Sequence, residues 1–185
     1  MSIVVIAAAA DRWNTYATLA EMRRAGDFET AKNLPRTFDS GVFPDSDSLR
    51  QERSMTAYAL GVEALNSEDP ETAIVWLQHA LRYANDNGEL HNDLGTALFD
   101  SGEFEGAIPA FNRALELPCR HASVFCNRGL AYGSLGDYEN ARRDFQSALK
   151  IEPDHEDARR YLQLLESAEQ PNLQQQKKAP ATLLR

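Results

Sequence analysis

The most constraining feature of the sequence is a pattern that recurs at one fixed interval between Ser54 and His155. We call this spacing, which separates Gly61 from Gly95 and Gly95 from Gly129, the repeat interval. Alanine, large apolar and acidic residues recur at the same spacing. The matching sets are Ala73, Ala107 and Ala141; Ala80, Ala114 and Ala148; Leu77, Phe111 and Phe145; and Glu71, Glu105 and Glu139. A fixed period of this size predicts a solenoid of stacked units.

The third copy indicates what one unit is. Apolar residues recur at helical spacing on both sides of a turn at Leu135-Gly136-Asp137. Asp137 is expected to cap the second helix, and Pro153 lies just past its expected end. Because Gly129 is small, two helices can approach closely where they cross. One such hairpin leaves an apolar face uncovered, so the units must stack.

The three copies, 54–87, 88–121 and 122–155, resemble tetratricopeptide repeats. The family pattern is a large residue, Leu-Gly and Tyr, followed by Ala, Phe, Ala and Pro at set offsets. The third copy fits it best, with Phe125, Gly129, Tyr132, Ala141, Phe145, Ala148 and Pro153. The first copy has Glu68-Asp69-Pro70 at its turn, where Gly-Asp-Tyr stands in the third. The resemblance implies an all-α, right-handed helical-repeat solenoid of antiparallel helix pairs.

The N-terminal segment, residues 1–53, is less regular. Trp13–Lys32 contains a second Gly-Asp-aromatic turn, but Leu19 takes the place of the repeat glycine and Pro35 would shorten the second helix. A degenerate fourth repeat within residues 11–45 therefore remains a hypothesis, followed by a turn-rich connector, Leu34–Ser48. The apolar residues 1–10 lack the positive region of a secretory signal, and we expect them to pack on a neighbour or to fray.

The C-terminal segment begins with an apolar stripe, formed by Ala158, Tyr161, Leu162 and Leu165. A single amphipathic helix over 156–169 would cap the last unit, whose core is otherwise exposed. Residues 170–185 show no periodicity, and we expect them to be disordered.

Composition limits the environment and the partners. Two cysteines in 185 residues suit a reducing cytoplasm, and no stretch reaches the roughly 20 apolar residues that a membrane helix needs. Residues 54–155 carry sixteen acidic and seven basic side chains, so the repeats are the acidic part of the chain. Such a field disfavours nucleic acids and anionic membranes, although it can also serve solubility alone.

No grouping of residues indicates catalysis. The four histidines make no His-x-x-x-His pattern, and Cys119 and Cys126 make no Cys-x-x-Cys pair. No phosphate-binding loop or nucleophile elbow occurs either. We therefore expect no enzyme activity, no cofactor and no metal.

The resemblance implies a binding surface instead. In tetratricopeptide proteins the first helices of the units line a concave groove that holds a segment of a partner. Carried over by repeat position, the candidate residues are Tyr58, Val62, Asn92, Thr96, Phe99, Cys126, Asn127 and Leu130. Tyr58 and Phe99 could act as aromatic anchors, and the amides of Asn92 and Asn127 could hold a peptide backbone. Some of these residues, Val62 and Leu130 above all, could instead complete the packing between units.

The resemblance also bears on the charge of the partner. Some members of the family grip acidic C-terminal tails with a clamp of lysine, arginine and asparagine. Those places hold no cation in this chain, whether they are counted from the first unit or from the second. They hold Tyr58, Val62, Asp93, Ser123 and Asn127 in one register, and Asn92, Thr96, Asn127, Asp157 and Tyr161 in the other.

We therefore expect an adaptor or scaffold that binds a neutral or basic protein segment and works as a monomer or weak homo-oligomer. The alternative is a structural module that self-associates through its repeats and apolar N-terminus.

Overall fold

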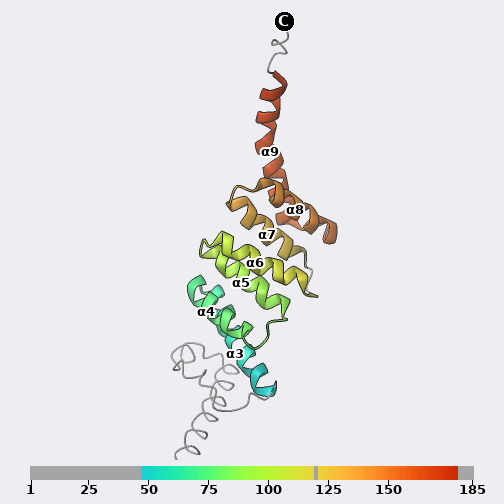
Figure 1. Cartoon of the computed structure of the whole chain (residues 1–185). Helices are drawn as coiled ribbons and strands as arrows, with labels where there is room; N and C mark the ends of the chain where they lie inside the picture. Colours follow the sequence, from blue (N-terminus) through green and yellow to red (C-terminus); the bar gives the residue numbers. More distant parts are fainter. Residues whose placement is uncertain (1–46, 119–120, 179–185) are drawn as a thin grey trace, which may run out of the picture.

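The computed structural model describes residues 47–118 and 121–178, in which every regular element is an α-helix (Figure 1). The helices are α3 (Asp47–Asn66), α4 (Pro70–Leu81), α5 (Gly88–Asp100), α6 (Phe104–Glu116), α7 (Ala122–Ser134), α8 (Tyr138–Ile151) and α9 (Glu156–Lys178). They form three antiparallel pairs, α3–α4, α5–α6 and α7–α8, which stack along one axis with α9 at the end. The predicted fold class is confirmed.

The helices follow the predicted period closely, except at the first unit. The first helices α5 and α7, together with α9, begin at Gly88, Ala122 and Glu156, which are separated by the repeat interval. By contrast, α3 begins at Asp47 rather than near the predicted boundary at Ser54. Residues 49–53, Leu-Arg-Gln-Glu-Arg, are good helix formers, so nothing in this stretch stops the helix from starting earlier.

The repeated glycines lie where the two helices of a unit come closest, as predicted. A Cβ atom added at any of them would lie well inside van der Waals distance of the second helix. Its distance to the nearest side-chain atom would be 2.8 Å at Gly61 (Cγ of Leu77), 2.6 Å at Gly95 (Cε1 of Phe111) and 2.8 Å at Gly129 (Cε1 of Phe145). The small residue and the large one are therefore two halves of a single crossing.

The turn inside each unit needs one residue with a positive φ. Gly102 and Gly136 supply it at 85° and 79°, but in the first unit the residue is Glu68, at 55°. Asp69 and Asp137 then cap the second helices, since their carboxylates accept hydrogen bonds from backbone N–H groups in the first turn of the helix. The predicted cap at Asp137 is confirmed.

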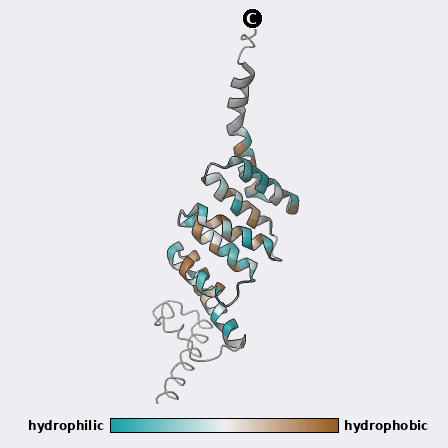
Figure 2. Ribbon diagram, viewed as in Figure 1, coloured by the Kyte–Doolittle hydropathy of each residue, from teal (hydrophilic) through white to brown (hydrophobic). Residues whose placement is uncertain are grey.

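The core is shared between neighbouring units. Leu77 of the first unit is buried in one cluster with Leu90 of the second, and Phe111 of the second with Val124 of the third. Polar and apolar stretches alternate along the described helices (Figure 2). Each unit therefore depends on the next one to cover its apolar face.

The last helix, α9, covers the end of the stack. Ala158 is fully buried against α7 and α8, and Tyr161, Leu162 and Leu165 pack around the same cluster. Exposed Gln163 stands one repeat interval after Gly129, at the glycine place of the repeat. No described helix crosses α9 there, so a long side chain fits.

The end of α9 differs from the prediction. The helix runs to Lys178, so the expected disordered tail is wrong for residues 170–178. The prediction ended the helix where its apolar stripe ends, just before Pro171, but the leucine, glutamines and lysines that follow are good helix formers. Residues 179–185 lie outside the described part, as do the N-terminal residues 1–10, the hypothetical repeat in 11–45, and Cys119.

Candidate binding surface

The predicted site residues lie on α3, α5 and α7, the first helices of the three units. We call this region the first-helix surface, and define it by Tyr58, Val62, Glu89, Asn92, Asp93, Thr96, Phe99, Asn127 and Leu130. Helix α3 contacts α5, and α5 contacts α7, so residues from all three units share one face. All of these side chains are partly or fully open to solvent.

A chain of polar side chains connects the three helices. The hydroxyl of Tyr58 donates to Oδ2 of Asp93 at 2.9 Å, and Nδ2 of Asn92 donates to Oδ1 of the same carboxylate at 3.3 Å. Nδ2 of Asn127 in turn donates to Oδ1 of Asn92 at 3.4 Å. We call these four residues the polar ladder.

The polar ladder follows the repeat. Tyr58 and Asp93 are 35 residues apart, and so are Asn92 and Asn127. Each bond therefore joins a residue on one first helix to the residue that lies one repeat interval plus one position further along the chain, on the next first helix. Asp93, at the centre, was not among the predicted site residues. Its position one repeat interval before Asn127 was the signal that could have identified it.

Burial and neighbouring charge shape the ionisation of the polar ladder. Burial, followed by the nearby Asp93 carboxylate, raises the pKa of Tyr58 beyond its usual range, so its hydroxyl stays a donor. Burial also raises the pKa of Asp93, and the hydrogen bonds from Tyr58 and Asn92 oppose this effect. Exposed Glu89 adds a second negative charge on α5 and raises both pKa values a little further.

The apolar members of the surface differ in how firmly they are held. Phe99 packs against the core between the second and third units, and its ring centroid lies 5.2 Å from that of Phe104. Leu130 packs against the cluster under α9, whereas Val62 belongs to none of the core clusters. Thr96 donates its hydroxyl to the backbone oxygen of Asn92. Phe99 and Leu130 therefore serve packing as well as the surface.

Cys126 does not belong to the first-helix surface, so its prediction as a groove residue is wrong. Only 3% of it is exposed, because it packs with Phe145 and Ala158. Tyr161 of α9 packs against the same cluster. Tyr161 follows Asp93 and Asn127 at the repeat interval, and these two residues are the hydrogen-bond partners of Tyr58 and Asn92. Burial raises the pKa of the Cys126 thiol to about 11. A small apolar side chain at this place is simply covered by its neighbours.

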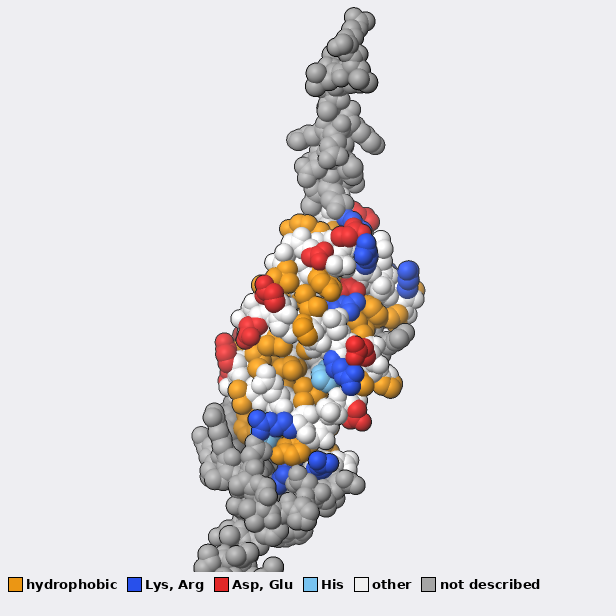
Figure 3. All heavy atoms as spheres, viewed as in Figure 1, with side chains coloured by type: hydrophobic (Ala, Val, Ile, Leu, Met, Phe, Trp, Pro, Cys, Tyr) orange, Lys and Arg blue, Asp and Glu red, His pale blue; other side chains and the backbone are white. Residues whose placement is uncertain are grey.

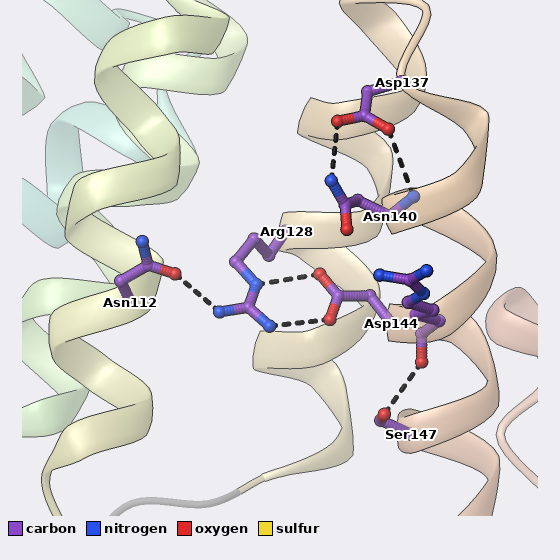
Figure 4. A network of polar contacts seen from close by, with 7 residues as sticks. Asn112, Arg128, Asp137, Asn140, Asp144 and Ser147 are labelled. Carbon is purple, nitrogen blue, oxygen red and sulfur yellow. Dashed lines mark hydrogen bonds and ion pairs between the residues drawn. The ribbon is translucent and has the colours of Figure 1, made fainter.

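Arg128, the one cation in α5 and α7, is already engaged. Its guanidinium makes two bonds to the Asp144 carboxylate, at 2.8 and 2.7 Å, and a third to Oδ1 of Asn112 on α6 (Figure 4). The rings of Phe125 and Tyr132 have their centroids 5.7 and 5.9 Å from it. This cluster joins the second and third units and offers no positive charge to a ligand.

Charge on the described part is therefore uneven. In Figure 3 acidic side chains lie along the left edge of the face, and others accompany lysine and arginine near its top and right, while hydrophobic ones are scattered over its middle. Among the described residues there is no group of three or more histidine, cysteine or acidic side chains that could hold a metal ion. None of the described helices is long and apolar enough to span a bilayer.

Comparison with known proteins explains this architecture. Two family models match the chain, one for the tetratricopeptide repeat over residues 122–155 and one for the TPR repeat over residues 95–136. The chain is a tetratricopeptide repeat protein. The resemblance identified in the sequence is thereby confirmed.

Curated relatives match this chain over part of their length. Tetratricopeptide repeat protein 36 from Xenopus tropicalis is 29% identical over 71% of this chain and 63% of its own length. The peptidyl-prolyl cis-trans isomerase FKBP4 from Homo sapiens is 26% identical over 60% of this chain, which is only 26% of that protein. The chain thus spans less than two thirds of the length of either relative.

Solved structures agree on the fold. The TPR domain of Arabidopsis OM64 has a TM-score of 0.61 and 22% identity, over 63% of this chain and 96% of that one. The first TPR of Spaghetti (RPAP3), solved with the HSP90 peptide SRMEEVD, has a TM-score of 0.61 and 22% identity, over 69% and 98%. These likenesses show the fold alone, and the matched repeats identify the chain as a protein–protein interaction module.

Proposed function

We propose that this protein is a non-catalytic adaptor whose first-helix surface binds a segment of a partner protein, neutral or basic rather than acidic. The observation that carries the proposal is the polar ladder. It places a carboxylate, Asp93, at the centre of the surface, where the resemblance implies an asparagine in family members that grip acidic tails.

The cost to an acidic ligand supports the charge preference. A terminal carboxylate would find no cation at Tyr58, Val62 or Asn127 and would lose charge-assisted hydrogen bonds worth about 1.5–3 kcal/mol each. It would also approach Asp93 and Glu89, and like charges slow the encounter as well as weakening the complex. A lysine or arginine side chain would meet attraction at the same place.

This preference separates the chain from some of its structural neighbours. The Spaghetti TPR was solved with an acidic peptide, SRMEEVD. Its 22% identity to this chain leaves room for a different ligand on the same fold.

Two further elements of the proposal rest on the sequence. No residue pattern indicates catalysis, so we propose that binding is the whole activity, and the two cysteines favour the cytoplasm as the compartment. The alternative of self-association depends in part on residues 1–10, which lie outside the described residues.

Affinity capture tests the adaptor function. The full chain and its Tyr58→Ala/Asn92→Ala variant would be compared as bait in native extract, after circular dichroism has shown that both are folded. We expect the variant to lose specific partners that the wild-type chain retains. Identical partner profiles would point to self-association or to another face, and light scattering of the isolated chain would distinguish these two outcomes.

A further inference from the structure

We propose that the segment bound on the first-helix surface is a basic amphipathic α-helix lying across α3, α5, α7 and α9. This inference rests on the proposed function, because it specifies the ligand of the same surface. Three independent features support it: the hydrogen bonds of the polar ladder, the spacing of the first helices, and a row of side chains that continues onto α9.

The polar ladder disfavours an extended ligand. An extended segment leaves its backbone N–H and C=O groups unpaired, so its binding surface must supply partners for them. Here Nδ2 of Asn127, both polar atoms of Asn92 and the carboxylate of Asp93 already bond to one another. In a helical ligand the backbone N–H and C=O groups bond to one another, so the surface needs to contact only its side chains.

The spacing of the first helices also suits a helical ligand. Helices in contact lie about 8–10 Å apart, and a ligand helix covers that distance in about five to seven residues, so that at the wider spacing about two turns bring the same face to the next unit. A β-strand covers the same distance in about three residues. Because successive side chains of a strand point to opposite faces, the residue that reaches the next unit would point away from the surface. A polyproline helix would present the same face to each unit, because three of its residues span about 9 Å. It has no internal hydrogen bonds, however, and its backbone would need hydrogen-bond partners that are already bonded within the polar ladder.

A row of side chains, one from each first helix and from α9, offers contacts for such a face. Val62, Thr96, Leu130 and Leu164 follow one another at the repeat interval. Because α9 buries Ala158 at the place where α7 buries Val124, Leu164 takes the position on α9 that Leu130 has on α7. Leu164 is 57% exposed, so α9 extends the surface as well as capping the core.

The charge of the helix follows from the flank of this row. Glu89 and Asp93 lie beside it on α5, Arg128 on α7 is bound to Asp144, and Arg160 on α9 is paired with Asp157. Lysine or arginine on either side of an apolar stripe would therefore complement the surface. Acidic side chains there would meet repulsion.

A displayed library of random peptides provides an unbiased probe. Peptides of about 20 residues, which as helices span about 30 Å, would be selected on the full chain. The matched variants are Val62→Asn/Leu164→Asn, which removes apolar contacts outside the core clusters, and Asn92→Ala/Asn127→Ala, which removes amides of the ladder. Circular dichroism and the unfolding midpoint would establish that both variants fold.

We expect the enriched peptides to carry apolar residues at helical spacing together with lysine or arginine, and to gain helical signal on binding. A central proline, or the Val62→Asn/Leu164→Asn substitutions, should weaken binding about tenfold or more, the loss typical of an anchor residue. As the control, Val75→Asn at an exposed position of α4, outside the first-helix surface, should change binding by less than about threefold, in the range of a near-neutral contact.

Three outcomes would overturn the inference. They are enriched peptides that tolerate proline and depend on Asn92 and Asn127, peptides that bind the Val62→Asn/Leu164→Asn variant equally well, and no enrichment at all. The first outcome would leave the adaptor function standing, because an extended segment would then occupy the same surface. The partner capture described above tests that function separately.

Discussion

Replacing glycine by alanine should have opposite effects at Gly95 and Gly106, although both glycines lie in helices. At Gly95 the new methyl group would lie 2.6–2.9 Å from three atoms of the Phe111 ring, which is fully buried and has no room to move. At Gly106 the nearest side-chain atoms are 3.8 Å away, which is an ordinary contact. The two positions therefore separate the packing effect from the helix propensity of alanine.

The magnitudes follow from these distances. Overpacking costs about 1–3 kcal/mol, and alanine regains up to about 1 kcal/mol of helix propensity, so Gly95→Ala should destabilise the fold by about 1–2 kcal/mol. Gly106→Ala gains propensity without a clash and should stabilise it by about 0.5 kcal/mol or slightly more. Gly129→Ala, facing Phe145, should behave like Gly95→Ala.

Urea unfolding followed by circular dichroism of the helical signal measures both variants. The free energies of unfolding should differ by about 2 kcal/mol between Gly95→Ala and Gly106→Ala, with the wild type between them. If Gly95→Ala were as stable as Gly106→Ala, the crossing of α5 and α6 would not depend on the missing side chain, and the packing argument would be refuted.

Further predictions concern the turns, the buried ion pair and pH. Glu68→Gly should raise the free energy of unfolding, measured in urea, by about 0.5–1 kcal/mol. Glycine adopts the left-handed conformation of this position without steric strain, and this gain exceeds the extra backbone entropy that glycine loses on folding. Arg128→Leu should cost about 3–5 kcal/mol by stranding the buried Asp144, against at most about 1 kcal/mol for Arg113→Ala in an exposed pair. The raised pKa of Asp93 means that the folded state holds this proton more tightly than the unfolded state, so its contribution to stability falls as pH rises from about 3.8. The stability of Asp93→Asn relative to wild type should therefore increase over that range, and a flat difference would contradict the assignment.

The parts of the fold that the sequence predicted are those fixed by local rules or by the repeat. The glycine crossing and the cap at Asp137 depend on residues within one unit, and three aligned copies made them visible. The end of α9 could not be placed in the same way, because the apolar stripe ends before it and Pro171 gave no sign that the helix would continue.

The candidate site was predicted less completely, because its details arise between units. The bond from Tyr58 to Asp93 joins residues of two different units, so no local pattern reveals it. Cys126 follows Tyr58 and Asn92 at the repeat interval, and this spacing alone gave no sign that Cys126 would be buried. Its burial depends on the size of the side chain and on Tyr161 of α9.

The claim that the first-helix surface prefers partners that are not acidic is open to one direct measurement. The labelled peptide SRMEEVD, the ligand named for the Spaghetti TPR, would be titrated by fluorescence anisotropy beside the same peptide with its three acidic residues replaced by lysine. The account predicts weaker binding of the acidic peptide, with a difference that narrows at higher salt and in the Asp93→Asn variant. Tighter binding of the acidic peptide, sensitive to Asn127→Ala, would contradict it.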